Sequence, residues 1–234
     1  MTSIAQFAPA SAMQPLPENN QHRGGRHAVI VCNPDRHSFD HSIALRYAET
    51  VRIAGHDAVI RDLYAMGFDP VLKIDEQPSD QAFAPARDVA RELQELAGCE
   101  VFVLVYPIWF GTPPAMLKGY IERVLGAGVR PQTVHEGGPT ALLGHKTLLS
   151  FTTSATTNVW LDEQGQPMAL RQVVDLYLVH AFGMRKQSHV SFDHITADMS
   201  DHFAQQYLLE VEEEAKRVCV EISALSNGAG RAQG

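Results

Sequence analysis

The stretch "VYPIWFGTPPAMLKGYIERVLGAG", Val105 to Gly128, joins the end of an apolar strand to a new helix. The strand pattern breaks at Trp109 and Phe110, and two prolines then fit the start of a helix, where no backbone N–H is needed. We expect Thr112 to cap this helix and a glycine to end it. In α/β proteins, a loop at the carboxyl end of a core strand is where ligands bind.

Strand and helix patterns alternate along the rest of the chain. Short apolar or β-branched runs predict buried strands at 27–33, 57–63, 100–107, 146–154 and 184–192. Helical spacing with cap and stop signals predicts helices at 38–55, 83–98, 112–128, 167–183 and 198–225. Five strands with helical crossovers predict one α/β domain over residues 27–225, built on a doubly wound, five-stranded parallel sheet. We expect residues 1–26 to form a disordered N-terminal arm and residues 226–234 a disordered tail.

The composition limits the classes of partner. Lys and Arg total 19 against 27 Asp and Glu, a net charge of −8, which argues against general binding to nucleic acid or anionic membranes. No apolar run approaches the roughly 18 residues of a membrane span, so we expect no membrane insertion. Three cysteines without CxxC spacing and the lack of a secretory signal favour a reducing cytoplasm. The 11 histidines show no ligand spacing such as HExxH, so we expect no metal site.

Three loops follow predicted strands at the carboxyl edge of the sheet. The first, residues 33–39, leads into a helix N-terminus, whose free amides favour an anion such as phosphate. His37 and Ser38 add hydrogen-bond donors, although Ser38 is equally typical of a plain helix cap. Asp40 argues against a phosphate unless its carboxylate points away. The chain lacks both GxGxxG and GxxxxGK[ST], so it supports neither a Rossmann nucleotide site nor a phosphate-loop ATPase.

The other two loops offer different chemistry. Residues 152–160 carry hydroxyl and amide groups that can hydrogen-bond the edge of a flat heterocycle. Residues 107–113 carry Ile108, Trp109 and Phe110, which can flank a planar ring, although such side chains are also typical of packed core or of a dimer contact. A phosphate site, an apolar wall and a polar rim on one sheet edge together predict a nucleotide-like aromatic cofactor.

Several segments also carry a family resemblance. "YPIWFGTPPAMLKGYIERVLGAG" resembles the P-x-W-[WF]-x-x-P-A-x-L-K-G-[WY]-x-[DE]-R-V segment of flavin-dependent NAD(P)H:quinone oxidoreductases. This flavodoxin-like family includes the mammalian quinone reductases and a potassium-efflux ancillary flavoprotein. "DLYAMGFDPVL", residues 62–72, resembles the family's D-L-Y-x-x-x-F-[DN]-P-[VIL] segment, and "RHSFD" resembles its T-S-F-N loop. "SFTTSATTNVW" lies where the family has a T-T-G-G turn, and the matches run in order from about residue 27 to 183.

The resemblance implies a bound flavin and the reaction that goes with it. Hydride would pass from NAD(P)H to flavin N5 and then to a quinone or a related small-molecule acceptor, in ping-pong fashion. FAD is favoured over FMN, and the family implies a homodimer. The alternative function is that of an ancillary flavoprotein which docks on a membrane transport protein, and a pure electron carrier ranks third.

The resemblance also implies which residues contact the flavin, and all of them lie on the three loops. They are Asn33, His37, Ser38, Phe39 and Asp40 on the phosphate side, Pro107, Ile108, Trp109 and Phe110 along the ring, and Thr152, Thr153, Ser154 and Ala155 at the ring edge.

The sequence departs from the family at several of its functional positions. Asn33 replaces a family histidine, and Asp40 replaces the usual asparagine. Trp160 and Gln166 stand where the mammalian enzymes have a tyrosine and a histidine that assist charge relay, and neither is a proton donor with a useful pKa. The T-T-G-G turn reads T-T-S-A at residues 152–155, so side chains narrow a place where backbone approaches closely. These changes leave the catalytic residues unassigned.

Overall fold

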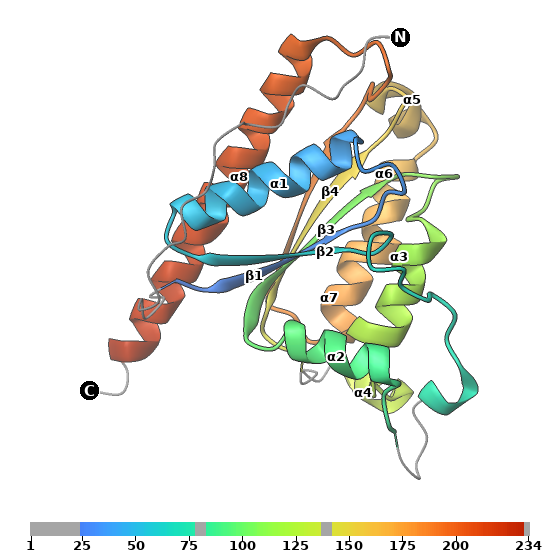
Figure 1. The fold of residues 1–234 in the computed structure, drawn as a ribbon, viewed down its shortest axis with the longest axis vertical. Helices are drawn as coiled ribbons and strands as arrows, with labels where there is room; N and C mark the ends of the chain where they lie inside the picture. The colour runs from blue at the N-terminus through green and yellow to red at the C-terminus, as the bar shows by residue number, and fades with distance from the viewer. Residues whose placement is uncertain (1–23, 78–82, 137–141, 232–234) are drawn as a thin grey trace.

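The computed structural model describes residues 24–77, 83–136 and 142–231, and it is built on one parallel sheet (Figure 1). The strands are β1 (Arg26–Val31), β2 (Asp57–Asp62), β3 (Cys99–Pro107), β4 (Thr147–Thr153) and β5 (Lys186–Phe192). Their order is β2-β1-β3-β4-β5, and every neighbouring pair is parallel. The expected doubly wound, five-stranded sheet is confirmed, in the order that flavodoxin-like sheets show.

Helices cover both faces of the sheet (Figure 1). On one face lie α1 (Phe39–Ile53) and α8 (Asp201–Arg231). On the other lie α2 (Arg87–Glu95), α3 (Ala115–Tyr120) with the π-helical turn η2 (Ile121–Leu125), and α6 (Gln166–Leu170) with the π-helical turn η3 (Arg171–Leu176) and α7 (Tyr177–Ala181). The short helices η1 (Ile74–Glu76), α4 (Pro131–Glu136) and α5 (Asn158–Glu163) belong to the connections.

The central strand β3 is buried on both faces, which explains its nearly uninterrupted apolar sequence. Leu104 and Tyr106 pack toward the α2, α3 and α7 side, whereas Val103 and Val105 pack toward α1 and α8. Alternate residues of a strand point to opposite faces, so one short segment supplies both halves of the core.

The helix after β3 begins later than the sequence predicts. Thr112 does not cap it, because Thr112 pairs its backbone with Trp109 through N–H to O distances of 3.1 and 3.0 Å. Phe110 and Gly111 form the bend of this turn, with φ of 51° and 79°. Pro114 is the N-cap, and α3 starts at Ala115.

The last helix is longer than the sequence predicts. α8 continues to Arg231, so the tail expected at residues 226–234 is helical over residues 226–231. Adding residues to an existing helix costs far less than nucleating one, which explains why a Gly-containing segment extends it. The arm expected at residues 1–26 lies outside the described residues up to residue 23, and β1 begins at Arg26.

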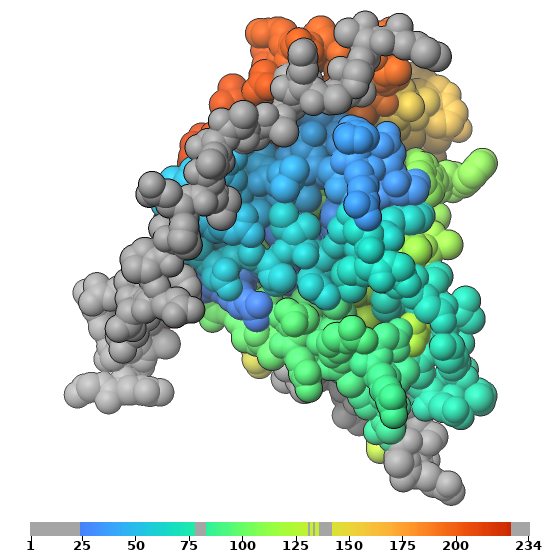
Figure 2. All heavy atoms as spheres, in the orientation of Figure 1, coloured from blue at the N-terminus to red at the C-terminus, as the bar shows by residue number. Residues whose placement is uncertain are grey.

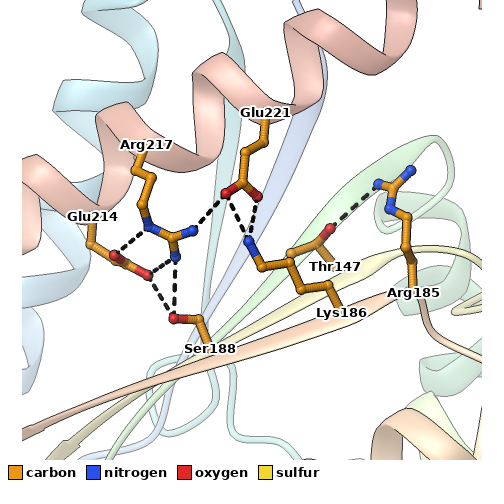
Figure 3. Close-up of polar contacts among 7 residues, drawn as sticks. All are labelled: Thr147, Arg185, Lys186, Ser188, Glu214, Arg217 and Glu221. Atoms are coloured by element: carbon orange, nitrogen blue, oxygen red, sulfur yellow. Dashed lines mark hydrogen bonds and ion pairs between the residues drawn. The ribbon is translucent and has the colours of Figure 1, made fainter.

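Ion pairs hold α8 over the edge strand β5 (Figure 3). Arg217 donates to Glu214 and Glu221, and Lys186 of β5 reaches the same Glu221 at 2.7 Å. Partly exposed pairs of this kind stabilise the fold little, but they set the position of the helix along the strand. Among the described residues, no helix has the combined length and apolar character that crossing a membrane requires.

A buried arginine joins three elements on the other face. Arg123 of η2 is 1% exposed and donates to both carboxylate oxygens of Glu76, at 2.8 and 2.7 Å. Its guanidinium also donates to Asp88 of α2 at 2.9 Å and lies 5.4 Å from the ring centre of Phe68. The hydrogen bonds from Arg123 hold the pKa of Glu76 below its usual range. Arg123 therefore fixes η1 and α2 to the helix that follows β3.

Replacing Arg123 tests how much its contacts with Glu76 and Asp88 stabilise the fold. Arg123→Met leaves the buried carboxylate of Glu76 without its partner, and we expect the free energy of unfolding to fall by about 3–5 kcal/mol, measured by urea denaturation.

The control lies on the same helical segment. Lys118 forms an exposed i,i+4 pair with Glu122, so Lys118→Met changes the unfolding free energy by no more than about 1 kcal/mol. Equal losses in the two variants would show that Arg123 is not a structural clamp.

Candidate functional site

A cavity of about 850 Å³ opens at the carboxyl edge of the sheet. It lies where β1 and β3 meet, the point at which the strand order reverses and α/β sheets bind ligands. Its volume falls within the range of small-molecule sites. The structure brings most of the expected flavin contacts together here: Asn33, His37, Ser38, Phe39, Asp40, Pro107, Ile108, Trp109, Thr153, Ser154 and Ala155 all line the cavity. Phe110 and Thr152 do not.

The loop after β1 carries the start of α1 to the cavity. Ser38 is the N-cap of this 15-residue helix, and its Oγ accepts a hydrogen bond from the His41 N–H. The cap and the lining role are compatible, because Ser38 both ends the loop and faces the cavity. The amides of the first turn have no acceptor within the helix, so this end offers a place for an anion.

Asp40 points inward and binds the protein itself. The residue is 2% exposed, and its carboxylate accepts hydrogen bonds from Asn33 Nδ2 at 2.7 Å and Thr153 Oγ1 at 3.0 Å. Burial raises the pKa of Asp40, and these two hydrogen bonds oppose the rise. Asp40 thus joins the end of β1, the start of α1 and the end of β4, and it also lines the cavity.

The loop after β3 forms the apolar wall. Pro107 is buried, Ile108 is half-buried and Trp109 is 40% exposed, and all three line the cavity. The Ile108 N–H donates to the Thr153 carbonyl at 2.8 Å, which fixes this wall to β4. Phe110 is fully exposed instead, because the left-handed bend at its φ of 51° directs the chain away from the cavity.

The loop after β4 forms the polar rim. Thr153 is held by Asp40, and Ser154 Oγ pairs with Thr156 Oγ1 at 2.8 Å. Thr152 lies on the opposite face of β4, where its hydroxyl pairs with His189 Nε2 at 2.9 Å and Ser191 Oγ at 2.8 Å. The sequence placed Thr152 and Thr153 on one rim, but neighbouring residues of a strand point to opposite faces.

A network of buried, hydrogen-bonded side chains lies behind Thr152. Asp175 of η3 is fully buried and accepts hydrogen bonds from Ser150 Oγ at 2.6 Å and from His189 Nδ1 at 2.5 Å. Sequence reasoning missed this network, although hydroxyl residues inside an otherwise apolar strand were a signal for it. The network holds β4 and β5 together beneath the rim, and its side chains do not line the cavity.

Trp160 and Gln166 do not line the cavity either. Trp160 is half exposed on α5, and Gln166 Nε2 donates to the Gly111 carbonyl at 3.0 Å. The positions of the family's tyrosine and histidine therefore supply no proton donor to the cavity.

A fourth segment of the cavity escaped the sequence reasoning. Residues 195–200, between β5 and α8, line it together with Asp201, Ala204 and Leu208 of α8. Ser200 Oγ accepts a hydrogen bond from the Phe203 N–H, so a second helix begins at the cavity. Figure 2 shows the start of α8 (orange) on the same side of the molecule as the start of α1 (blue). Because every parallel strand ends at this edge, the loop after β5 belonged among the candidates.

A comparison with protein families places the chain. The sequence model for proteins of flavodoxin-like fold matches residues 26–215. The chain belongs to this flavodoxin-like family. Its relatives include an uncharacterized NAD(P)H oxidoreductase of Haemophilus influenzae, 34% identical over 54% of this chain and 63% of that protein. The NAD(P)H dehydrogenase [quinone] 1 of Rattus norvegicus is 30% identical over 58% of this chain and 56% of its own length. The chain thus spans about three fifths of these relatives, and the expected resemblance is confirmed.

Solved structures agree on the fold. An NAD(P)H:quinone oxidoreductase from Methanothermobacter marburgensis has a TM-score of 0.72 at 18% identity, covering 83% of this chain and 97% of that one. An FMN-dependent NADH-azoreductase from Bacillus anthracis, solved in complex with FMN, has a TM-score of 0.62 at 16% identity, covering 83% of this chain and 99% of that one.

The raised pKa of Asp40 gives a pH-dependent prediction. Burial raises the pKa of Asp40 in the folded protein above its pKa in the unfolded chain. The unfolded chain therefore loses this proton first, and the free energy of unfolding falls as the pH rises from the unfolded-state pKa through the folded-state pKa. Asp40→Asn removes this titration. We therefore expect the unfolding free energy of the variant, relative to the original chain, to increase as the pH rises from about 4, near the ordinary pKa of Asp.

Urea denaturation at a series of pH values measures this difference. A pH-independent difference in unfolding free energy between the two proteins reports only the changed hydrogen bonds. The test is therefore how this difference changes with pH. A difference that stays the same at every pH would contradict a raised pKa at Asp40.

Proposed function

We propose that the chain is a flavin-dependent NAD(P)H oxidoreductase that reduces quinones or related small-molecule acceptors. The observation that carries this proposal is the cavity at the β1–β3 switch point, which combines the N-terminus of α1, the Ile108–Trp109 wall and the Thr153–Ala155 rim. The names of the relatives from Haemophilus influenzae and Rattus norvegicus support the reaction class.

The described residues fit a flavin. Its phosphate would lie at the first turn of α1, where Ser38 and the backbone amides provide donors and the Asp40 carboxylate accepts hydrogen bonds from Asn33 and Thr153. Ile108 and Trp109 would cover an apolar ring face and exclude water from it. Thr153 and Ser154 are already positioned by Asp40 and Thr156, so little entropy is lost when they hold the ring edge.

The bound flavin would supply the redox chemistry, accepting hydride from NAD(P)H and passing it to the acceptor. The chain's own residues would hold and orient the reactants. Since Trp160 and Gln166 stand outside the cavity, we propose that protons come from solvent through the open side of the cavity, where Trp109 is 40% exposed.

We propose FAD as the cofactor rather than FMN. The cavity extends past α1 to residues 195–201 and the first turns of α8, which offers room for a second nucleotide half. No Lys or Arg lines the cavity in the described chain, so the N-termini of α1 and α8 would provide the favourable field for two phosphates.

Purified protein tests the function directly. We expect a yellow protein that releases FAD on denaturation, as identified by chromatography, and that consumes NAD(P)H rapidly when a quinone is added. A chain that takes up neither FAD nor FMN would contradict the proposal, and slow turnover of a tightly bound flavin would favour the ancillary role.

Two neighbouring aromatic residues provide a matched pair for the site. Trp109→Ala removes part of the cavity wall, so we expect at least a tenfold faster loss of flavin during dialysis, about 1.4 kcal/mol of binding free energy. Phe110→Ala removes a side chain that points to solvent, and flavin retention stays unchanged. The opposite pattern would place Phe110, and not Trp109, against the ring.

We also propose that the chain forms a homodimer. Large apolar side chains are exposed on α5, α6, η3 and α7, and we propose that they form the interface: Val159, Trp160, Met168, Val173, Leu176 and Tyr177. Monomers seldom expose contiguous apolar patches of large side chains, and such patches mark interaction sites.

One charge on this surface tests the dimer. Val173→Asp places a carboxylate in the proposed interface and should yield monomers by light scattering. Val220→Asp, at a position on α8 with the same 69% exposure as Val173, should leave the dimer intact. A monomeric original chain, or dimers in both variants, would contradict this interface.

We also propose that the protein is located in the cytoplasm. Cys32, Cys99 and Cys219 are all free and buried, which fits a reducing compartment.

A further inference from the structure

A second group of chemically competent side chains lies at the opposite, amino edge of the sheet. It consists of His27 near the start of β1, His56 just before β2, and Cys219 of α8. One imidazole nitrogen from each histidine and the Cys219 sulfur lie within 4.8 Å of one another. All three residues are buried, with exposures of 0%, 5% and 4%.

Each imidazole binds a protein hydroxyl through one ring nitrogen. His27 Nδ1 pairs with the Tyr47 hydroxyl at 3.0 Å, and His56 Nε2 pairs with Ser223 Oγ at 3.1 Å. His27 Nε2 is buried without a hydrogen-bond partner in the described part of the chain, and His56 Nδ1 has none within hydrogen-bond geometry, although the Gly25 backbone also interacts with the His56 ring. A ligating histidine typically binds a protein oxygen through its other nitrogen, which sets the tautomer and the ring orientation.

We propose that His27, His56 and Cys219 bind one thiophilic divalent cation, with Zn²⁺ as the expected metal. Imidazole and thiolate are the ligands that Zn²⁺ prefers, and Zn–N and Zn–S distances of about 2.1 and 2.3 Å place tetrahedral ligand atoms roughly 3.5 Å apart. Metal binding would require the three ligand atoms, which lie within 4.8 Å of one another, to approach to that spacing. The metal would link β1, the turn before β2 and α8.

Binding of the metal would change the protonation of Cys219. Because zinc binds the thiolate, each metal that binds at neutral pH displaces the Cys219 proton, which leaves to the buffer.

This site is absent from the sequence analysis, which predicts no metal. Metal motifs are recognised by short spacings, whereas these ligands are separated by tens of residues and meet only through the parallel pairing of β1 with β2 and the packing of α8. The cluster is independent of the proposed flavin site, because none of the three residues lines that cavity.

Zinc binding to the untagged full chain tests the proposal. After treatment with a chelator and equilibrium dialysis against Zn²⁺, we expect about one zinc per chain by elemental analysis. The zinc content of Cys219→Ala should fall to background. Cys99→Ala removes a buried free cysteine elsewhere in the core, and this variant should keep the metal. No zinc in the original chain, or equal zinc in it and in Cys219→Ala, would overturn the site.

Two further measurements keep the test decisive if a variant does not fold. Calorimetric titration of the original chain with Zn²⁺ in buffers of different ionisation enthalpy should show release of about one proton per metal. Co²⁺ should give a thiolate charge-transfer band, read as a difference spectrum so that any flavin cancels. Zinc binding without proton release, or Co²⁺ binding without that band, would exclude Cys219 as a ligand.

Discussion

The buried carboxylate of Asp40 is the interaction on which the site depends. It accepts hydrogen bonds from Asn33 at the end of β1 and from Thr153 at the end of β4, while its own backbone belongs to the first turn of α1. Thr153 in turn accepts the Ile108 N–H through its carbonyl. One side chain therefore sets the spacing of the three loops around the cavity. Leaving a buried carboxylate without such a partner lowers the free energy of unfolding by roughly 1–3 kcal/mol, so the arrangement is strongly specified.

The two edges of the sheet carry different chemistry. At the carboxyl edge, strand ends and helix N-termini surround an open cavity, as the geometry of a doubly wound sheet dictates. At the amino edge, α8 covers the strand starts, and His27, His56 and Cys219 are buried beneath it. Another buried pair, Arg123 with Glu76, lines neither site and joins η2 to η1.

The five-stranded parallel sheet, the positions of its strands and half of the cavity lining could be predicted from the sequence. Apolar runs and helical spacing are local signals, and parallel strands necessarily end at one edge, so the loops containing Ser38, Trp109 and Thr153 had to meet. A bend set by a single backbone angle could not be read in this way, whereas strand alternation in the predicted strand 146–154 was available to separate Thr152 from Thr153. Phe110 leaves the cavity because its φ is positive, and Thr152 faces the opposite side from Thr153.

Other features depend on distant contacts. Gln166 bonds the Gly111 carbonyl, and His189 bonds Asp175, through pairings that no sequence spacing encodes. The extension of α8 past Leu225 follows from helix propagation, which composition alone does not show. We propose that the cavity tied together by Asp40 holds the flavin, and a crystal structure of the purified chain with FAD is the direct test. We expect flavin density in this cavity, with a phosphate at the first turn of α1 and the ring against Ile108 and Trp109. Flavin bound at any other surface, with this cavity left to solvent, would contradict it.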